Sequence, residues 1–408
     1  MPEHIGSKLI GDARPGGRAR RARRLRHIRP ALACVVGLLT FGVAAATAGA
    51  ATWPTVQLST ASTTKPWWCS LPGTGSVPAC ATTPVSTGGG GTTGTGGGTT
   101  PGTGTSGTPK QAGAAFSGTF TNTSGSLAYQ GYVPSTYKSG TAMPLVVALH
   151  GCTESADQFR QLTRWDQVAE AKGFIVVFPE QSANNNQTKC WNFFQAAHMS
   201  RGSGEPSLIA GITQWVQQHY TVDARRTYVN GLSAGGAMSS VMAATYPDLY
   251  AAAGIGSGCE YAATAACAGY KSADPVQAGN AAFKAMGTHA RPMPVILFEG
   301  DKDTTVPPVN AQQLVQQWQV TDDLADDNSA NNSIPVAPTG VTNGSVPGGH
   351  TYTVTSYSNG HSELMQSWLV AGMGHAWSGG CSCEQYADPA GPDESTAMYT
   401  FFMAHPMP

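Results

Sequence analysis

Ser233 has the local sequence of a nucleophilic serine. It lies in the pentapeptide GLSAG at 231–235, which fits the G-x-S-x-G pattern of a tight turn between a strand and a helix. Such a turn lifts the hydroxyl above the sheet, and the N-terminus of the following helix directs backbone N–H groups toward developing negative charge. The pattern alone is weak evidence, but it occurs once in the chain, between a predicted strand and a predicted helix. It therefore predicts nucleophilic attack by Ser233.

A serine nucleophile needs a base and an acid that orients the base. Asp303 is the predicted acid because it follows a predicted strand, where a loop faces the site. Asp301 is the alternative, but its place at the strand end is more typical of a turn former. His375 is the predicted base because it follows Asp303 in a glycine-flanked loop. His150 is its rival, but it precedes Ser233 and lies where an oxyanion loop is expected.

The third requirement is a pair of backbone donors for the oxyanion. The amide of Ala234, directly after the nucleophile, is the first predicted donor. The second is the amide of Cys152, in the segment LHGCT at 149–153 after an early predicted strand. A disulfide between Cys152 and Cys190 would fix this loop next to Trp191. The alternative interpretation is a plain turn that ends the strand.

Alternating strands and helices position these loops. Residues 143–150 (MPLVVALH) form a continuous apolar run, as expected for a strand that is buried on both faces. Residues 156–173 have the periodicity of one helix that ends at a glycine. The alternation predicts an α/β fold with a mostly parallel sheet and helices on both faces. Further strands are expected at 174–180, 226–233, 251–258, 293–300, 351–358 and 362–370, and further helices at 207–220, 234–247, 310–319 and about 394–404.

The N-terminus has the pattern of a secretory signal peptide. Seven arginines between residues 18 and 29 precede an apolar stretch at 31–46. Ala-Gly-Ala at 48–50 fits the A-x-A cleavage pattern. A retained membrane anchor is the alternative, but the stretch is short for a span. We therefore expect residues 1–50 to be removed and the protein to be secreted into the extracellular space, by a route that the sequence leaves open.

Three further segments follow the predicted signal. Residues 51–85 contain tryptophan and cysteine, and are either a small adhesive module or a segment closed by one disulfide; the second is favoured because the segment is too short for a core. Residues 86–114 are almost wholly Gly, Thr, Ser and Pro, which is typical of a flexible linker. Residues 115–408 form the predicted catalytic domain.

Charge and cysteine content narrow the function classes. The formal net charge is −1, so no global basic field attracts nucleic acid. An even number of cysteines in a secreted chain favours disulfides over a metal site. The C-x-C spacing at 381–383 leaves two possibilities, a local bridge or bonds to Cys259 and Cys267. The predicted mature chain holds eight cysteines, at positions 69, 80, 152, 190, 259, 267, 381 and 383.

Together these motifs resemble the extracellular polyhydroxybutyrate depolymerase family of esterases, which is related to feruloyl and acetylxylan esterases. The resemblance implies an α/β-hydrolase fold and ester hydrolysis through an acyl-enzyme, without a metal or an organic cofactor. It also implies that Trp191 and Trp377 line the cleft. Many polymer-degrading members resemble a catalytic domain with a C-terminal substrate-binding domain, whereas the linker here precedes the catalytic domain. The matching pieces are LHGCTE (149–154), CWNFF (190–194), VDARRTYVNGLSAGG (222–236), GDKDTTVPP (300–308) and GMGHAWSGG (372–380).

Three functional hypotheses follow. The leading one is a serine esterase that hydrolyses poly(3-hydroxybutyrate)-type polyesters. The second is a feruloyl or acetylxylan esterase that acts on plant cell-wall esters. The third is a non-catalytic homologue that binds surfaces, against which the complete triad argues. The expected partner is a polyester or another ester-bearing polymer, without nucleic acid and without a membrane after signal cleavage, and we expect a monomer.

Overall fold

The computed structural model describes residues 112–263, 267 and 274–408. The predicted signal peptide, the segment 51–85 and nearly all of the predicted linker lie outside the described residues. The predicted catalytic domain is described from its first strand onward, which begins at Ala114. Among the described residues, no helix is both long enough and apolar enough to cross a membrane.

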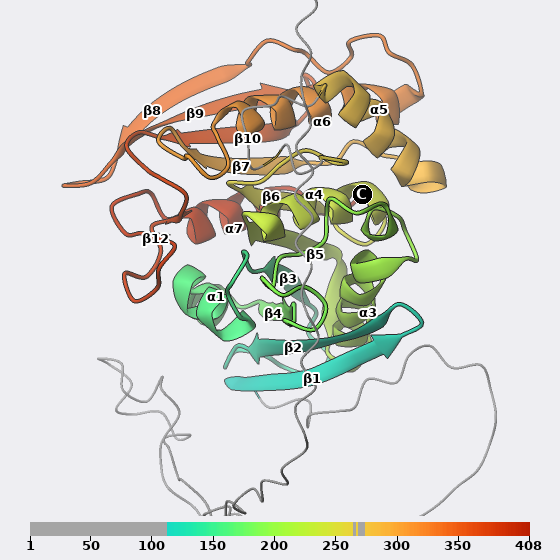
Figure 1. The fold of residues 1–408 in the computed structure, drawn as a ribbon, viewed down its shortest axis with the longest axis vertical. Coiled ribbons are helices and arrows are strands. Elements are labelled where there is room, and N and C mark those ends of the chain that lie inside the picture. The colour runs from blue at the N-terminus through green and yellow to red at the C-terminus, as the bar shows by residue number, and fades with distance from the viewer. Residues whose placement is uncertain (1–111, 264–266, 268–273) are drawn as a thin grey trace, which may run out of the picture. The chain divides into compact units, whose positions relative to one another are not determined.

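A ten-stranded sheet forms the centre of this domain (Figure 1). Its order is β1-β2-β4-β3-β5-β6-β7-β10-β9-β8. Short apolar strands that alternate with helices favour parallel pairing, because each helix carries the chain back to the start of the next strand. The parallel strands are β3 (Met143–Leu149), β4 (Ile175–Glu180), β5 (Val222–Leu232), β6 (Ala252–Gly256), β7 (Val295–Gly300) and β10 (Glu363–Val370).

Antiparallel strands extend both edges of the parallel sheet. β1 (Ala114–Asn122) and β2 (Gly125–Val133) form a hairpin beside β4. β8 (Gly340–Ser345) and β9 (Thr351–Ser358) form a second hairpin beside β10. A separate pair of two-residue strands, β11 (Trp377–Ser378) and β12 (Ala387–Asp388), lies in the segment between β10 and the last helix.

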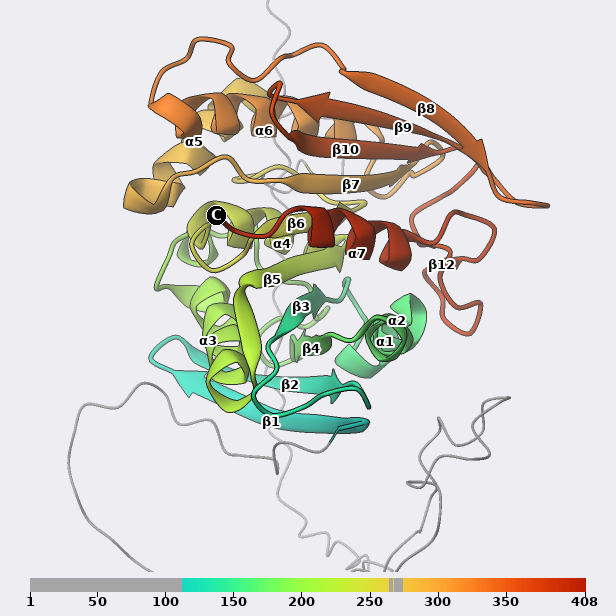
Figure 2. The same ribbon diagram turned by 180° about the vertical axis from the view of Figure 1, so that it is seen from behind.

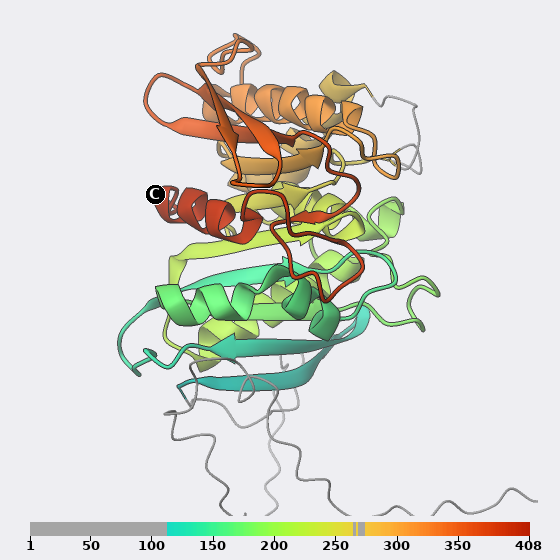
Figure 3. The same cartoon turned by 90° about the vertical axis from the view of Figure 1, so that its left-hand side faces the viewer.

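Helices cover both faces of the sheet, and the sheet separates the core into two layers (Figure 2 and Figure 3). The first layer packs against four helices, α3 (Gly204–His219), α4 (Ala234–Thr245), α5 (Pro275–Met286) and α6 (Val309–Asp327). The second packs against α1 (Ala156–Thr163), α2 (Trp165–Lys172) and α7 (Glu394–Ala404). Short 3₁₀ turns are η3 (Ala196–His198) and η5 (Gly287–His289).

The prediction of one helix over 156–173 is wrong. The chain forms α1 and α2, separated by Arg164 in the left-handed conformation at φ 54°. The Arg164 guanidinium donates to the carbonyl of Gly379, and the next side chain, Trp165, is fully buried and donates to Asn230 Oδ1 (3.0 Å). Tertiary contacts at the break thus override the helical periodicity of the sequence.

The predicted strands and the other predicted helices are confirmed within a few residues of their bounds, except that α6, predicted to end at residue 319, continues to Asp327. The sequence patterns did not predict the β1–β2 hairpin, β8, α5 or the two-residue strands β11 and β12. β8 is almost wholly exposed, so it has no alternation between apolar and polar residues that a sequence pattern could detect.

Candidate active site

Ser233 lies in a strained turn between β5 and α4. Its φ of 58° and ψ of −120° lie outside the regions that L-residues commonly adopt. The Ser233 N–H donates to the carbonyl of Gly256 on β6 (2.9 Å), which ties the turn to the sheet. A Cβ on Gly231 would lie 2.4 Å from the carbonyl carbon of Gly235, and one on Gly235 would lie 2.0 Å from Leu149 O. Both glycines of the motif are therefore required by close backbone packing.

α4 begins at Ala234 and all twelve of its residues are buried. A helix that is enclosed on all sides holds its first turn in a fixed position, and its free N–H groups give that end a partial positive charge. The Ala234 amide is at this end, where it was predicted to act as an oxyanion donor. The sequence pattern and the fold therefore agree on where the nucleophile turn lies.

Asp303 and His375 form a direct pair. Asp303 Oδ2 lies 2.6 Å from His375 Nδ1, although 72 residues separate them in the chain. Asp303 Oδ1 accepts the backbone N–H groups of Thr305 (2.7 Å) and Val306 (2.8 Å). Burial raises the pKa of Asp303, but the hydrogen bond and charge of His375 and the two amides outweigh it and lower that pKa below its usual value. Asp303 is thus a stable carboxylate that orients the imidazole.

The loop that carries His375 is held by residues at the end of β7. Asp301 Oδ1 accepts the N–H of Gly372 (2.7 Å), and the Lys302 N–H donates to Met373 O (2.9 Å). A Cβ on Gly300 would lie 2.3 Å from Met373 O, so the two segments touch along their backbones. Asp301 was predicted to be a turn former, and the structure shows that it also anchors the histidine loop.

The three predicted triad residues follow strands that share one edge of the sheet. Ser233 follows β5, Asp303 follows β7 and His375 follows β10, and these three strands run in the same direction. The structure forms the hydrogen bond between Asp303 and His375 but not one between Ser233 and His375. Contacts to a serine nucleophile are often long in the absence of substrate and shorten when it binds.

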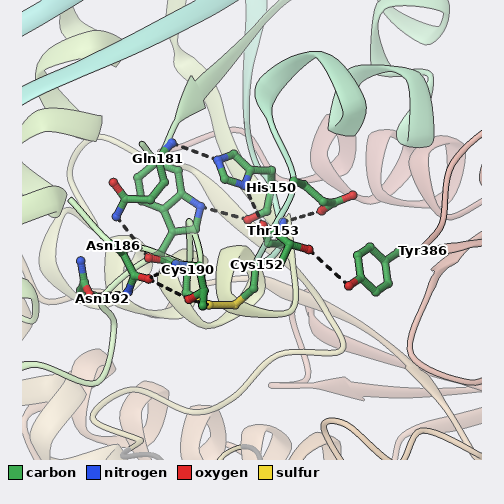
Figure 4. Close-up of a disulfide and its surroundings, with 12 residues drawn as sticks. His150, Cys152, Thr153, Gln181, Asn186, Cys190, Asn192 and Tyr386 are labelled. Carbon is green, nitrogen blue, oxygen red and sulfur yellow. Dashed lines mark hydrogen bonds between the residues drawn. A yellow bond between two sulfur atoms is a disulfide. The ribbon is translucent and has the colours of Figure 1, made fainter. Parts of the chain in front are cut away.

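The predicted oxyanion loop lies against the nucleophile. A Cβ on Gly151 would lie 3.5 Å from Ser233 Cβ. The next residue, Cys152, forms the predicted disulfide with Cys190 (Figure 4). Thr153 follows in the left-handed region at φ 68°, and its N–H donates to Thr188 O (2.7 Å). A disulfide and a backbone hydrogen bond thus hold the loop from the side of residues 188–190.

Glu154 holds the same loop through a side-chain hydrogen bond. Its Oε2 accepts the N–H of Gly151 (2.7 Å), and its side chain is buried. Burial raises the pKa of Glu154 to about 7, although the hydrogen bond from Gly151 opposes this shift. The sequence reading missed this role, and the only signal was an acidic residue directly after a predicted buried strand and its loop.

His150 is fixed as a structural residue. Its Nδ1 lies 2.7 Å from Gly151 O and its Nε2 accepts the N–H of Gln181 (2.9 Å), as Figure 4 shows for the contact with Gln181. Burial lowers the pKa of His150 to about 4, so the ring stays neutral with its proton on Nδ1. Both ring nitrogens are occupied, which supports the choice of His375 over His150 as the base.

The two tryptophans that were expected to line the cleft are buried. Trp191 is fully buried and donates its indole N–H to His150 O (3.0 Å). Trp377 is 1% exposed and donates to Ser395 Oγ (3.0 Å). The Trp191 ring thus contacts the oxyanion loop and the Trp377 ring contacts α7, and neither presents a surface to a substrate. The exposed aromatic side chain in the CWNFF segment is Phe194, which packs edge-on against Phe193.

Two further disulfides among the described residues resolve the alternatives for the C-x-C segment. Cys381 bonds to Cys383 and Cys259 bonds to Cys267. The C-x-C segment is therefore a local bridge. The Cys381 N–H donates to Leu162 O (2.9 Å), which ties this segment to the end of α1.

Comparison with known proteins agrees with this geometry. The family model named "Esterase PHB depolymerase" matches residues 127–334. The chain belongs to this family. The fold of this chain is an α/β-hydrolase fold. An acetyl xylan esterase from Aspergillus awamori superposes on it with a TM-score of 0.51 at 27% identity, over 61% of this chain and 89% of that one.

Two curated relatives indicate the range of the family. Poly(3-hydroxyalkanoate) depolymerase C of Paucimonas lemoignei is 31% identical over 264 residues, which are 63% of this chain and 60% of that protein. Acetylxylan esterase A of Talaromyces purpureogenus is 33% identical over 211 residues, 48% of this chain and 54% of that protein. The chain thus spans between half and two thirds of the length of these relatives.

Proposed function

We propose that this protein is a secreted serine esterase that hydrolyses poly(3-hydroxybutyrate)-type polyesters through an acyl-enzyme. The observation that carries the proposal is the 2.6 Å contact between Asp303 and His375 at the sheet edge where Ser233 lies in its strained turn. These are the three groups that nucleophilic acyl transfer requires, in the chain order of α/β-hydrolases. Membership of the esterase family supports the same reaction class.

Each residue has a defined role in the proposed mechanism. His375 takes the proton of Ser233 as the hydroxyl attacks the ester carbonyl, and Asp303 holds the imidazole and stabilises its positive form. The amides of Cys152 and Ala234 donate to the tetrahedral oxyanion. His375 then protonates the leaving alcohol. Water then attacks the acyl-enzyme with the same assistance from His375, and 3-hydroxybutyrate or short oligomers are released.

A groove beside the triad loops supports a neutral polymeric substrate. A concavity of about 460 Å³ lies between α6 and strands β9 and β10 and begins at Pro308, just after the Asp303 loop. None of its lining residues is charged. Val336 and Leu369 in this lining are 66% and 42% exposed. A polyester has ester carbonyls and apolar groups but no charge, so such a surface suits it.

An acetylxylan or feruloyl esterase is the alternative function. The curated relatives include acetylxylan esterases at the same level of identity as the depolymerase, and the A. awamori structure is an acetyl xylan esterase. The catalytic mechanism would be the same, and only the substrate would differ. The groove has one aromatic residue in its lining, the partly buried Tyr357, and its uncharged lining is our reason to place the polyester first.

The proposal includes secretion and the domain arrangement that the sequence predicts. A signal peptide over 1–50, a short segment over 51–85, a linker over 86–114 and a catalytic domain over 115–408 fit an exported enzyme. The three disulfides within the described residues support an oxidising compartment. We propose that the mature protein acts as a monomer outside the cell.

The test is the loss of turbidity of a poly(3-hydroxybutyrate) suspension with protein that starts at Ala51. Ser233→Ala is the matched inactive control. Clearing by the wild type alone supports the depolymerase. Turnover of p-nitrophenyl acetate and acetylated xylan or methyl ferulate, without clearing, would move the assignment to the cell-wall esterase. Binding to polymer without turnover of any ester by folded wild-type protein would identify a non-catalytic homologue.

A further inference from the structure

Tyr386 contacts both the oxyanion loop and the triad base. Its hydroxyl lies 3.3 Å from Thr153 Oγ1, within hydrogen-bonding distance, as Figure 4 shows. Its ring meets the imidazole of His375 edge to face, with the ring centroids 6.3 Å apart and the planes at 81°. Thr153 and Tyr386 are 233 residues apart in the chain. The partly buried tyrosine thus links two parts of the site that only the fold brings together.

Thr153 needs contacts that hold its backbone. Its φ of 68° lies in the left-handed region, where a β-branched residue is strained. The Thr153 N–H donates to Thr188 O (2.7 Å), and the disulfide between Cys152 and Cys190 holds the preceding residue. In Figure 4 this disulfide and the Tyr386 ring lie to either side of Thr153. The hydrogen bond with Tyr386 therefore holds the loop on the side away from the disulfide.

The segment that carries Tyr386 is itself fixed. The Trp377 N–H donates to Tyr386 O (2.7 Å), and the Gly379 N–H donates to Asp388 O (2.8 Å). These bonds accompany the pairing of β11 with β12. Asp388 Oδ2 also lies 3.0 Å from His350 Nε2, which ties the segment to the start of β9. A side chain on a fixed segment can hold a loop in place, whereas one on a loose segment would follow the loop.

The ring of Tyr386 acts on the base by packing. Asp303 Oδ2 lies 2.6 Å from His375 Nδ1, and this contact fixes one ring atom but leaves the plane of the imidazole free to tilt. An edge-to-face contact is a favoured arrangement of aromatic rings, so Tyr386 limits that tilt. His375 Nε2 is the nitrogen that must reach Ser233, and a tilt about Nδ1 would displace it.

We propose that Tyr386 is a positioning residue for both the oxyanion hole and the triad base. Its hydroxyl holds Thr153, and through it the neighbouring Cys152 amide, where the oxyanion forms, while its ring holds the plane of His375. The proposal rests on the proposed function, since it adds a residue to that same site. A donor aimed at the oxyanion stabilises the transition state more than the bound ester. Loss of the Tyr386 hydroxyl should therefore lower kcat and leave KM unchanged.

A double-mutant cycle in the full mature chain tests the hydroxyl contact. Tyr386→Phe keeps the ring and removes the hydroxyl, and Thr153→Ala removes its partner. We expect each to lower kcat for p-nitrophenyl acetate about three- to tenfold, and the double variant to lose little more than either single variant. Tyr386→Ala, which also removes the ring contact with His375, should lower kcat further, to at least about thirtyfold below the wild type.

Inhibition by n-butylboronic acid separates positioning from a general loss of folded enzyme. A boronic acid forms a tetrahedral adduct with a nucleophilic serine, and one of its oxygens takes the place of the oxyanion. We expect the inhibition constant to rise in Tyr386→Phe by about the factor by which kcat falls, as it does for an analogue of the transition state. A smaller fraction of folded enzyme would lower kcat without changing the inhibition constant.

Tyr132→Phe is the matched control. The Tyr132 hydroxyl donates to Glu170 Oε2 (2.8 Å), and Tyr132 pairs with Val176 near the start of β4, at the end of the parallel strands opposite to the site. This variant also loses one tyrosine hydrogen bond, so kcat, KM and the boronic acid inhibition constant should equal those of the wild type. Thermal unfolding of every variant checks that it is folded.

Three results would overturn the inference. The first is wild-type kinetics in folded Tyr386→Phe. The second is a fall in kcat with no change in the inhibition constant. The third is a set of additive losses in the cycle with Thr153→Ala. Ser233→Ala separates these failures from that of the proposed function: an inactive Ser233→Ala leaves the triad standing whatever Tyr386 does, whereas an active one removes the triad and the role of Tyr386 with it.

Discussion

Backbone packing dominates on the nucleophile side of the site, whereas the acid–base side adds hydrogen bonds of carboxylates to its backbone contacts. The nucleophile side consists of residues 149–154 and 231–236, where a Cβ on Gly235 would lie 2.0 Å from Leu149 O. The acid–base side consists of residues 299–306 and 372–375, where Asp301 and Asp303 bind the histidine loop through their carboxylates. A closely packed backbone has no room for a larger residue, but its packing does not depend on pH. Carboxylate contacts leave room for a substitution of similar shape, but their strength depends on the charge of the carboxylate.

The family match extends over the nucleophile side and over part of the acid–base side. The family model matches residues 127–334. This range includes the nucleophile side and Asp303 but ends before His375. The histidine reaches the site because β10 pairs in parallel with β7, and its loop is then fixed by contacts with residues 300–302. The acid–base side is therefore assembled by tertiary pairing from segments that no local motif connects.

The largest expected effect tests whether the two sides act as one unit. We expect Ser233→Ala and His375→Ala each to lower kcat for a soluble ester by at least about 10³-fold, and the double variant to lose little more. Single-turnover and steady-state rates for the three variants measure this. A loss below tenfold for Ser233→Ala would remove it as the nucleophile, and additive losses would argue that the two residues do not share a step.

The packing of the nucleophile side predicts a large loss of stability in Gly235→Ala. The added methyl meets the backbone oxygens of Leu149 and His150 at 2.0 and 2.6 Å, so we expect a loss of about 3 kcal/mol in the free energy of unfolding. Gly374→Ala on the acid–base side is the matched control, since a Cβ there has nothing within 4 Å. Urea unfolding of both variants decides the point, and equal stabilities would contradict the contrast.

Glu154 is the exception on the nucleophile side, because its contact depends on charge. Its pKa is raised to about 7 in the folded protein against about 4.5 for an exposed glutamate, so the folded state holds the proton more tightly than the unfolded state. The stability of the wild type should therefore fall as pH rises from about 4.5 to about 7, by roughly 2–3 kcal/mol.

Glu154→Gln removes this dependence while keeping an oxygen that accepts the Gly151 N–H. We expect the variant to be more stable than the wild type at pH 8 and similar to it at pH 4. Unfolding free energies at a series of pH values measure the difference. Parallel curves for the two proteins would show that Glu154 has an ordinary pKa.

The smallest expected effect concerns Asp301. Asp301→Ala removes the acceptor for the Gly372 N–H but leaves the backbone contacts of Lys302 with Met373, so we expect kcat to fall about three- to tenfold with KM little changed. Asp301→Asn keeps an acceptor and should recover most of the activity. A loss as large as that of His375→Ala would mean that Asp301, and not Asp303, orients the imidazole.

Much of the fold could be predicted from the sequence because local patterns are strong in its centre. β3 is buried at all seven positions, so its residues form an unbroken apolar run. Arg164 shows the limit of such patterns: its left-handed backbone divides a periodic stretch into α1 and α2, and the contacts that stabilise the break lie with Gly379, more than 200 residues away.

The sequence by itself determined the type and the order of the chemical groups: a G-x-S-x-G turn, an aspartate after one strand and a histidine after another. Only the tertiary structure decided which aspartate meets His375, that Trp191 and Trp377 are buried, and that Glu154 accepts the N–H of Gly151. The physical reason is distance along the chain. Motifs and periodicity arise from neighbouring residues, whereas burial and the partners of a carboxyl group arise from segments that meet only when the sheet forms.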